Sequence, residues 1–425
     1  MTSSTLLVAP AADPAAAPLP SHVADVDMAF ERYPTEALMR ITQRPPQVFT
    51  HGRGSWLWDS QGRAHLDLVQ GWAVNVLGHA PPAVAAALST QAGRLLQPGP
   101  GLYNDQAIKL AQRLAHLSGL DQCFFTSSGA EANEGAIKLA RKFGRVHRGG
   151  AHEIITFVNA FHGRTLATMS ASGKPGFDVM FAPQVPGFPK ARLNDIDSVR
   201  ALVHSGTVAV LLEPIQGEAG VIEAEPAFLH QLRELCDAHG LLLMFDEIQT
   251  GLGRTGELWG WQASGVRPDV MTLGKGLGGG VPIGALLAVE FACCFEPGDQ
   301  GGTYCGNALM CAAALAVLGA ISAPGFMATV QARAQQLRDG LNAIAQRVGS
   351  PPVSGRGMLL ALELPASHPA GALTDALRQR ASDDGRAPGL LVNPVRPQRL
   401  RFVPALNISA GEVDLALALL GEALT

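Results

Sequence analysis

A lysine in a glycine-rich turn is the residue of this chain that is best suited to covalent chemistry. Lys275 lies between two glycines in the segment Pro268–Gly284 (PDVMTLGKGLGGGVPIG) and follows the apolar run Val270–Leu273, which predicts a strand. Glycine allows a ligand to approach the backbone closely, and a neutral lysine amine can attack a carbonyl to form a Schiff base. The alternative is a surface loop with an incidental lysine, so the choice depends on the rest of the chain.

Acidic residues end two apolar runs upstream of this turn. Glu213 directly follows Val208–Leu212, and Asp246 directly follows Leu241–Phe245. An apolar helical stripe that ends at Gly240 separates the two runs, which predicts a βαβ unit with parallel strands. Acids at the carboxyl ends of buried parallel strands lie where α/β sheets bind ligands. A solvated acidic loop is the weaker alternative, because each acid adjoins its apolar run.

Two other predicted strands also end in residues that could bind a ligand. Phe124–Thr126 leads into Ser127–Asn133, where small and hydroxyl residues begin a helix, and a helix N-terminus binds anions. Ordinary serine capping is the alternative. Glu153–Phe157 leads into a loop with Phe161 and Arg164, which could form a platform for a planar ligand and a carboxylate-binding group. A loop with a core phenylalanine would look the same.

The residues around these motifs predict the elements that must position them. Ser55–Leu68 alternates around a turn and predicts a β-hairpin. The C-terminal region alternates helices and strands, which predicts a second, smaller α+β domain. The other predicted elements are helices at 82–96, 105–117, 308–321, 330–348 and 410–423, and strands at 357–364, 389–393 and 400–403.

Composition argues against several classes of function. The 425 residues are 47% hydrophobic and 16% charged, and a net charge of −4 without a basic block argues against nucleic acid. The 6 cysteines and 12 histidines lack metal-site spacing, which predicts free thiols in a reducing cytosol and no metal. No apolar run reaches the ~18 residues of a membrane span. Met1–Pro20 is Ala/Pro-rich without a basic residue and predicts a flexible extension rather than a signal peptide.

Two glycine patterns invite a different interpretation. Gly251–Gly256 and Gly274–Gly279 both satisfy GxGxxG, which occurs in dinucleotide-binding proteins. That fingerprint also needs a long helix that starts at the glycines and an acid about 20 residues farther on. The short segment between Gly256 and Pro268 leaves no room for such a helix, so we expect no dinucleotide-binding dehydrogenase.

Six motifs together resemble a known family. SSGAEANEGAIKLAR, FHGRT, EPIQGEAGV, DEIQTGLGRTG, TLGKGLGGGVPIGA and GGTYCGN are similar, in order and spacing, to the class III (ω-amino acid) aminotransferases, which use pyridoxal 5'-phosphate. The likeness extends from about Tyr33 to the C-terminus. Within the family, VQGWAVNVLGH and GLLVNPVRPQRLRFVPALN resemble the members that act on N-acetylornithine.

The resemblance implies an α/β architecture. We expect a large domain of pyridoxal-phosphate transferase fold type I around a mostly parallel seven-stranded sheet, plus a smaller α+β domain. The expected boundaries are a flexible extension at 1–25, a segment at 26–80 that joins the small domain, the cofactor-binding domain at 81–322 and the C-terminal small domain at 323–425. The family also implies a homodimer with shared active sites. The composition described above predicts a cytoplasmic protein without nucleic acid or membrane partners.

The resemblance implies a role for each matching residue of the cofactor site. Lys275 would hold the cofactor covalently, and Asp246 would pair with the protonated pyridine nitrogen, which keeps the ring an electron sink. The other expected contacts are the phosphate-binding Ser128, Gly129 and Ala130, the ring-stacking Phe161, Gln249 beside the ring hydroxyl, its neighbours Glu247 and Ile248, and the partner subunit's Thr303.

The family pattern also implies a substrate site. Arg164 matches the arginine that binds the substrate carboxylate, Arg401 matches a second arginine, and Glu218 is its expected ion-pair partner. Glu218 would neutralise Arg401 in one half-reaction and swing away in the other, with a static ion pair as the alternative. The remaining expected contacts are Gly71, Trp72 and Gly302.

Gly71, Trp72 and Gly302 bear on specificity. Gly71 leaves room for an acyl group where ornithine-using relatives carry a tyrosine. Trp72 stands where many members that act on N-acetylornithine have an aliphatic residue, which would narrow the acyl pocket. Gly302 stands where many members carry a hydroxyl residue. Glycine has no side chain that could make the hydrogen bond of that hydroxyl to substrate or phosphate.

The implied reaction is a transamination between small amino acids and 2-oxo acids. The ω-amino group of N-acetylornithine would pass to 2-oxoglutarate, giving N-acetylglutamate 5-semialdehyde and glutamate, as in arginine biosynthesis. Alternatives within the family act on succinylornithine, ornithine, GABA or a diamine. An isomerase or a non-catalytic cofactor-binding protein would be a different class, and the intact Lys275, Asp246 and paired arginines argue against the second of these.

Overall fold

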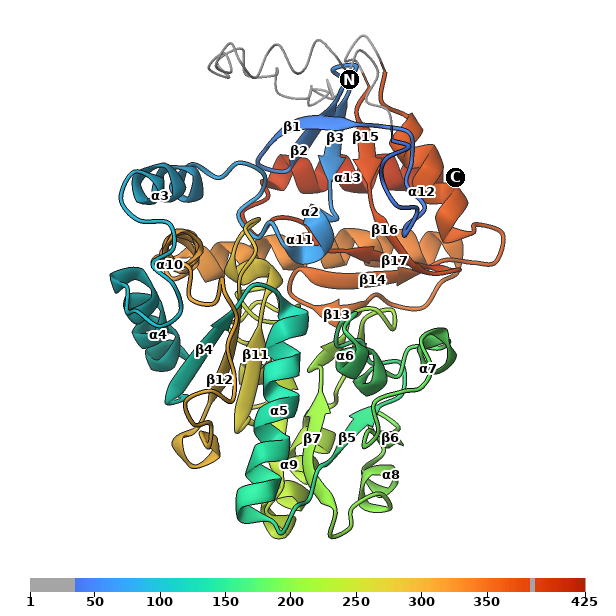
Figure 1. Ribbon diagram of the computed structural model, residues 1–425. Coiled ribbons are helices and arrows are strands. Elements are labelled where there is room, and N and C mark those ends of the chain that lie inside the picture. Colours follow the sequence, from blue (N-terminus) through green and yellow to red (C-terminus); the bar gives the residue numbers. More distant parts are fainter. Residues whose placement is uncertain (1–34, 383–386, 425) are drawn as a thin grey trace.

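The computed structural model describes residues 35–382 and 387–424, and its largest element is a seven-stranded sheet (Figure 1). β12 is antiparallel to both of its neighbours, and the other adjacent pairs are parallel. The expected α/β class with a mostly parallel seven-stranded sheet is therefore confirmed. In spatial order the strands are β4 (Gln122–Thr126), β12 (Gly284–Ala288), β11 (Val270–Leu273), β10 (Leu242–Asp246), β7 (Thr207–Leu212), β5 (Glu153–Phe157) and β6 (Lys190–Ala191).

Helices cover both faces of this sheet because its central strands are apolar on both sides. β7 and β10 are buried along their whole length. Leu211 packs in one core with residues of α5 (Gly129–His147), whereas the adjacent Leu212 packs in another core with residues of α9 (Pro226–His239). In Figure 1, α5 crosses the near face of the sheet and α9 lies behind it. The βαβ unit β7–α9–β10 is parallel, as predicted.

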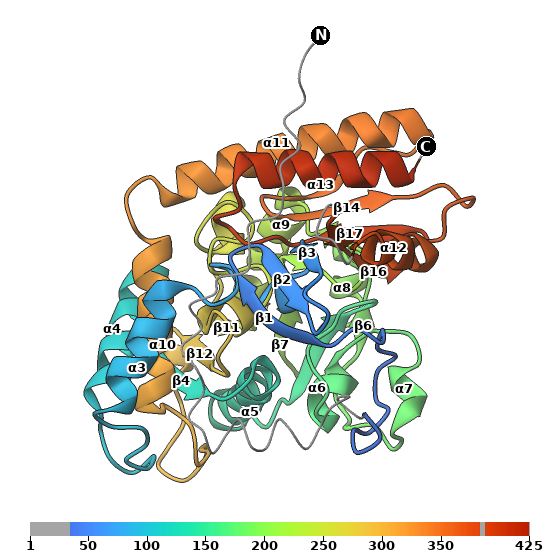
Figure 2. The same ribbon diagram turned by 90° about the horizontal axis from the view of Figure 1, so that it is seen from above.

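The smaller part of the molecule is built on an antiparallel four-stranded sheet that lies above the large sheet in Figure 1. Two long helices, α11 (Phe326–Val348) and α13 (Ala410–Ala423), run side by side along it (Figure 2). The spatial order of its strands is β13 (Ser354–Arg356), β14 (Leu359–Glu363), β17 (Arg399–Phe402) and β16 (Asn393–Arg396).

Another sheet joins segments from opposite ends of the chain. β15 (Gly389–Leu391) pairs in parallel with β3 (Ala64–Asp67). β3 also pairs with β2 (Trp56–Asp59), and these two strands form the predicted hairpin. β1 (Phe49–Arg53) completes the sheet at the side of β2.

Most predicted elements are present, with small shifts at their ends. Neither GxGxxG segment begins a long helix, because residues 251–256 form turns and Gly274 leads into the short η2 (Lys275–Leu277). β12 has no counterpart among the predicted strands, and the extension expected at Met1–Pro20 lies outside the described residues. The other elements are α2 (Gln70–Ala73), α3 (Pro82–Ala92), α4 (Asp105–Ser118), α6 (Leu166–Ala171), α7 (Phe177–Met180), α8 (Ile196–Arg200), β8 (Ile215–Gln216), β9 (Ile222–Glu223), η1 (Gly260–Ala263), η3 (Glu290–Ala292), α10 (Ala308–Ile321) and α12 (Ala370–Gln379).

The length and hydrophobicity of the helices bear on membrane crossing. Within the described part of the chain, no single helix is both long and apolar enough to cross a bilayer. The pair α10 and α11 passes by length and composition when the two are taken together, but the pair is bent by 73°.

Candidate active site

The strand ends that carry the sequence motifs meet around one cavity. Lys275 follows β11, Asp246 ends β10, Glu213 follows β7 and Phe161 follows β5. Since these four strands are parallel, their carboxyl ends lie at the same edge of the sheet. All four residues line a cavity of about 270 Å³, together with Gly129 at the start of α5. The expected grouping of a lysine, acids, an aromatic ring and a helix start is thus present in the structure.

Three groups orient the Asp246 carboxylate. Asn133 Nδ2 donates to Asp246 Oδ2 at 2.7 Å, and His162 Nδ1 lies 2.8 Å from the same oxygen. The backbone N–H of Ile248 donates to Oδ1 at 3.1 Å. Thr272 Oγ1 in turn donates to Asn133 Oδ1 at 2.7 Å, which fixes the orientation of the amide. Asp246 is therefore held in one position at the base of the cavity.

Asn133 and His162 were not predicted as site residues. Both are buried and contact Asp246, and His162 also lines the cavity. The available signal was the position of Asn133 on the apolar stripe of α5, between Ala132 and Ala136, which are both buried. A buried amide at such a position needs a hydrogen-bond partner. Sequence alone could have indicated that such a partner exists, but not which residue it is.

The start of α5 forms an anion-binding end of the cavity. Ser128 caps this 19-residue helix by accepting a hydrogen bond from the backbone N–H of Glu131 at 3.3 Å. Gly129 and Ala130 line the cavity. A Cβ atom at Gly129 would lie 2.8 Å from Ile248 Cδ1, so a side chain at this position would collide with Ile248. The N-terminal N–H groups and the positive end of the helix dipole favour a phosphate or carboxylate at this point.

Lys275 has the environment of a reactive amine. Burial lowers the pKa of its amine, and the positive charge of Arg401 lowers it further, against the opposing effects of Glu218, Asp246 and Glu213. Its backbone φ is 39°, in the left-handed region where a residue with a side chain is strained. The lowered pKa increases the neutral fraction of the amine, which is the form that attacks carbonyls.

Glu213 is a second titrating group at the cavity wall. Burial, followed by the charge of Asp246, raises the pKa of its carboxyl group to about 8. The backbone N–H of Phe161 donates to Oε1 at 2.9 Å, and that of Gly217 donates to Oε2 at 3.4 Å. Glu213 therefore links the loop of the aromatic platform to the loop that carries Glu218.

The expected pairing of Arg401 with Glu218 is present. Arg401 Nη2 lies 2.8 Å from Glu218 Oε1, and the arginine is fully buried. Its guanidinium also donates to Asn393 Oδ1 at 2.7 and 3.1 Å and to Gln249 Oε1 at 3.2 Å. Gln249 thus contacts Arg401 and also lines the cavity that contains Lys275. Burial opposes ionisation of Glu218, but the surrounding cations, with Arg401 foremost, hold the pKa of its carboxyl group below the usual value.

Arg164 lies at a more open part of the same cavity. Its guanidinium carbon is 5.5 Å from the centre of the Phe177 ring, which contributes a cation–π contact. The rings of Phe161 and Phe177 are 6.2 Å apart and tilted by 60°. The Arg164 side chain is exposed, so it can meet a carboxylate that enters from solvent.

Glu247 does not line this cavity. Its carboxylate accepts hydrogen bonds from Thr250 Oγ1 at 2.6 Å and from the backbone N–H groups of Gly260 and Trp261 at 2.9 and 2.8 Å. Because consecutive residues at a strand end point to opposite sides, Glu247 faces away from its neighbour Asp246. Glu247 therefore stabilises the loop at Gly260, which differs from the expected contact with a cofactor.

Thr303 and Gly302 lie in a different cavity of the same chain, which also contains Ser127 and Tyr304. Gly71 and Trp72 are exposed on the short turn α2, which packs against η2. All four residues of that turn, Gln70 to Ala73, have positive φ angles between 47° and 68°. Within one chain the structure therefore does not bring these four predicted residues into direct contact with the Lys275 cavity.

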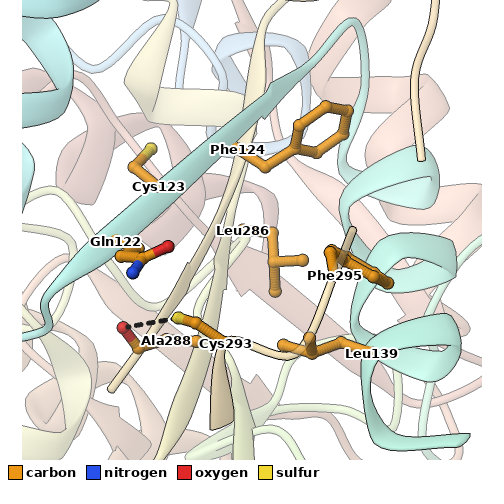
Figure 3. A pocket seen from close by; sticks show the side chains of 8 residues that line it. All are labelled: Gln122, Cys123, Phe124, Leu139, Leu286, Ala288, Cys293 and Phe295. Carbon is orange, nitrogen blue, oxygen red and sulfur yellow. Dashed lines mark hydrogen bonds between the residues drawn. The ribbon is translucent and has the colours of Figure 1, made fainter. Parts of the chain in front are cut away.

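A further cavity of about 200 Å³ opens at the outer edge of the central sheet, between β4, β12 and the residues that follow β12 (Figure 3). Its walls are mainly apolar, with Phe124, Leu286 and Phe295 around the two thiols of Cys123 and Cys293. Burial raises the pKa of Cys293 to about 11 and that of Cys123 higher still. Neither thiol is therefore ionised near neutral pH, and the cavity lacks the reactive groups present around Lys275.

The chain is similar to known proteins over most of its length. The aminotransferase class-III family pattern matches residues 39–424. The chain is 56% identical to acetylornithine aminotransferase 2 of Bordetella bronchiseptica over 389 residues, which covers 92% of this chain and 96% of the relative. It is 53% identical to acetylornithine aminotransferase of Ralstonia nicotianae, which covers 92% of this chain and 98% of that protein.

Solved structures show the same architecture. The N-acetylornithine aminotransferase of Stenotrophomonas maltophilia matches with a TM-score of 0.76 and 36% identity, covering 93% of this chain and 98% of that one. The ornithine aminotransferase of Toxoplasma gondii matches with a TM-score of 0.88 and 30% identity, covering 96% and 98%. The family match over residues 39–424 and the relatives at 53% and 56% identity therefore show that this chain belongs to the class-III aminotransferase family.

Proposed function

We propose that this protein transfers the ω-amino group of N-acetylornithine to 2-oxoglutarate with pyridoxal phosphate as its cofactor, a step of arginine biosynthesis. The observation that carries the proposal is the 2.8 Å ion pair between Arg401 and Glu218 next to the Lys275 cavity. A transaminase that accepts an ω-amine and then an α-keto acid needs a cation beside the reacting carbon in only one half-reaction. An arginine that pairs with a glutamate can be neutralised in one half-reaction and can bind a carboxylate in the other. The names of the similar proteins support the acylated donor.

The residues around the cavity fit a phosphorylated pyridine aldehyde. Gly129, where a Cβ would collide with Ile248, leaves the helix start open to a phosphate. The oriented Asp246 carboxylate suits a protonated ring nitrogen, and the Phe161 ring suits a planar group. When bound, pyridoxal phosphate supplies an electron sink for the bond that breaks at the substrate carbon.

Lys275 would perform the proton transfer. In its neutral form the Nζ atom can accept the proton from the substrate carbon that carries the amino group, as a general base. The lowered pKa of this amine supports that assignment, because more of it is neutral near pH 7. Asp246 stays in place during this step, since Asn133 and the Ile248 N–H hold both of its oxygens.

The two arginines would orient both substrates. Arg164 would bind the carboxylate that lies far from the reacting carbon, which both N-acetylornithine and 2-oxoglutarate possess. Arg401 would bind the carboxylate that adjoins the reacting carbon, which only 2-oxoglutarate and glutamate possess. Glu218 would neutralise Arg401 when N-acetylornithine places a methylene group there, because an unpaired buried guanidinium is costly.

The proposal includes a cytoplasmic homodimer in which Thr303 completes the site of the other subunit. Large apolar side chains near Thr303 are exposed, with Leu102 at 66%, Tyr103 at 94% and Tyr304 at 67%. Such a group of exposed apolar residues is typical of a protein interface. Free cysteines in the described residues are consistent with a reducing compartment.

A donor panel tests the proposal. The protein, loaded with pyridoxal phosphate, is assayed with N-acetylornithine, succinylornithine, ornithine and GABA, each with and without 2-oxoglutarate. We expect the highest kcat/KM for N-acetylornithine and no net turnover without the oxo acid. Turnover that needs no acceptor would indicate an isomerase, and a preference for an unacylated donor would contradict the assignment of the substrate.

A further inference from the structure

We propose that Lys174 is the second binding partner of Glu218, and that it holds the Glu218 carboxylate while a substrate carboxylate occupies Arg401. This inference rests on the proposed function, in which Arg401 is masked in one half-reaction and occupied in the other. Lys174 is not among the residues predicted from the sequence, and it lies in the loop between α6 and α7.

Glu218 lies between two cations at unequal distances. Its Oε1 is 2.8 Å from Arg401 Nη2, and its Oε2 is 3.9 Å from Lys174 Nζ. The side chain of Arg401 is 0% exposed, that of Glu218 is 28% exposed and that of Lys174 is 36% exposed. Movement of the carboxylate from Arg401 toward Lys174 is therefore movement from the interior toward solvent. A direct N–O contact of ~2.8 Å requires an approach of only about 1 Å.

The ammonium group of Lys174 lies over two aromatic rings, one of which, Phe161, lines the cavity. Its Nζ lies 5.7 Å from the ring centres of both Phe161 and Phe177, so it makes cation–π contacts with the aromatic platform. The Lys174 carbonyl accepts a hydrogen bond from the backbone N–H of Phe177 at 3.2 Å. The preceding Gly173 exchanges backbone hydrogen bonds with Asn159 and Ala160 at 2.9 and 3.0 Å. The backbone of Lys174 is therefore held in place, and its ammonium group lies over the two rings within reach of Glu218.

The backbone around Glu218 is also fixed, which limits the motion to the side chain. Arg396 Nε donates to the Ala219 carbonyl at 3.2 Å, and Arg399 Nη1 donates to the Gly220 carbonyl at 3.0 Å. Both arginines belong to the strands on either side of the β16–β17 turn, and Arg401 lies on β17 as well. The small domain thus anchors the loop of Glu218 while one of its own arginines binds the Glu218 side chain.

Charge explains why a second partner is needed. When a substrate carboxylate binds Arg401, Glu218 loses its ion pair and faces a like charge beside it. A partly buried carboxylate without a partner is costly, and that cost would weaken binding of the dicarboxylate substrate. Contact with Lys174 offsets the cost and moves the two negative charges apart. Lys174 then assists the 2-oxoglutarate half-reaction and has little effect on the half-reaction with N-acetylornithine.

Two other roles for Lys174 make different predictions. If it bound the far carboxylate together with Arg164, both substrates would lose affinity when it is replaced. If it bound the carboxylate at Arg401 directly, the dicarboxylate alone would lose affinity, whether or not Glu218 is charged. The proposed role predicts a selective loss that depends on the Glu218 charge.

A double-mutant cycle on the cofactor-loaded protein separates these roles. Lys174→Met keeps the apolar stem over the rings and removes the charge, and it is made alone and with Glu218→Gln. Calorimetry measures the Kd of glutarate, which has two carboxylates, and of N-acetylnorvaline, which resembles N-acetylornithine without the ω-amine. Single-turnover rates with 2-oxoglutarate and N-acetylornithine are measured in parallel. Lys174→Arg tests rescue by charge, and Arg192→Met removes a remote cation that is 74% exposed.

We expect Lys174→Met to weaken glutarate binding and slow the 2-oxoglutarate half-reaction about tenfold, the size of a lost charge-assisted contact. N-acetylnorvaline binding and the donor half-reaction should change less than about twofold, as should all values in Arg192→Met. In the Glu218→Gln background, Lys174→Met should have no selective effect. Equal losses for both ligands, a selective loss that persists in the Glu218→Gln background, or no loss at all would each overturn the inference. Failure of the proposed function would instead appear as absent turnover in the unmodified protein.

Discussion

Asn133 Nδ2 donates to Asp246 Oδ2 at 2.7 Å and, from the same nitrogen, to the backbone carbonyl of His162 at 2.7 Å. One side chain on α5 thus joins the acid at the end of β10 to the loop after β5. Asn133 and Asp246 are both buried, so their contact is made in a low-dielectric environment where hydrogen bonds to charges are strong. The position of Asp246 depends on a residue that itself does not line the cavity.

Replacement of Asn133 by alanine should therefore impair catalysis through Asp246. The change removes a donor to a carboxylate and leaves the Thr272 hydroxyl without its acceptor, which should lower the free energy of unfolding by about 1–3 kcal/mol. We expect kcat to fall at least tenfold with a smaller change in KM. Urea unfolding and steady-state kinetics measure the two effects. Thr272→Ser retains the hydroxyl and serves as the control that should stay close to the unmodified protein.

Lys275 should carry the cofactor covalently. Lys275→Ala removes the amine whose pKa is lowered by burial and Arg401, so borohydride treatment should no longer fix the cofactor to the protein. Mass spectrometry of the reduced protein checks this result. Normal turnover together with a reducible linkage in the variant would show that another amine performs the role.

Glu213 should make the stability of the protein depend on pH. Burial and Asp246 raise the pKa of this carboxyl group from 4.5 to about 8. Between those values the folded protein binds more protons than the unfolded chain, so this group's contribution to stability falls as pH rises through that window. Glu213→Gln removes the titration. We expect the unfolding free energy of the unmodified protein, relative to that of the variant, to decrease from pH 5 to about pH 8.

Contacts of Arg254 with residues that flank the antiparallel four-stranded sheet indicate that this arginine positions Arg401. Arg254 is fully buried and donates to the carbonyls of Met358 at 3.1 Å and Pro404 at 2.6 Å. Met358 directly precedes β14, and Pro404 lies two residues after β17. Arg401 is on β17, which pairs with β14. Burial lowers the pKa of Arg254 to about 9.

Arg254→Met should accordingly raise the KM for 2-oxoglutarate about tenfold, because displacement of the β17 end shifts Arg401, while the KM for the donor should change less. Arg254→Lys keeps a charge and one carbonyl contact. Its KM for 2-oxoglutarate should therefore lie between that of Arg254→Met and that of the unmodified protein. Equal changes in both KM values would indicate a general loosening of the fold.

The sequence predicted well those features that depend on local patterns. The apolar runs before Glu213 and Asp246 predicted buried parallel strands, because strands covered on both faces are continuous in hydrophobicity, and the run before Lys275 predicted a strand. Glycines next to Lys275 predicted a close approach of chain and ligand. These signals need no knowledge of distant contacts, and the structure places all three residues around one cavity.

Features that depend on tertiary contacts were not predictable in this way. Glu247 follows Asp246 in the chain, yet it faces the loop at Gly260, since the side of a strand end is set by its register. Lys174 acts through Glu218, which is 44 positions away, and Asn133 acts through Asp246, which is 113 positions away. The left-handed turn around Trp72 contains a single glycine, so its backbone is held by surrounding structure rather than by local preference.

The pairing of Glu218 with Arg401 leads to a last prediction, on the direction of the reaction. Arg401 is fully buried and has hydrogen bonds to Asn393 and Gln249 that do not involve Glu218. Glu218→Ala therefore leaves the guanidinium in place and unmasked. It should favour 2-oxoglutarate and glutamate over the ω-amine donor by about 1–3 kcal/mol, the strength of a charge-assisted contact.

Single-turnover rates for the two half-reactions decide between a switch and a static ion pair. A switch predicts a slower reaction with N-acetylornithine, because a buried cation without a partner then faces its methylene group. The 2-oxoglutarate reaction should be retained or faster, because its carboxylate no longer competes with Glu218 for Arg401. Glu218→Gln, which keeps the size of the side chain without its charge, should show the same asymmetry. Equal losses in both half-reactions would mean that the ion pair only stabilises the fold, since a structural contact does not distinguish the substrates.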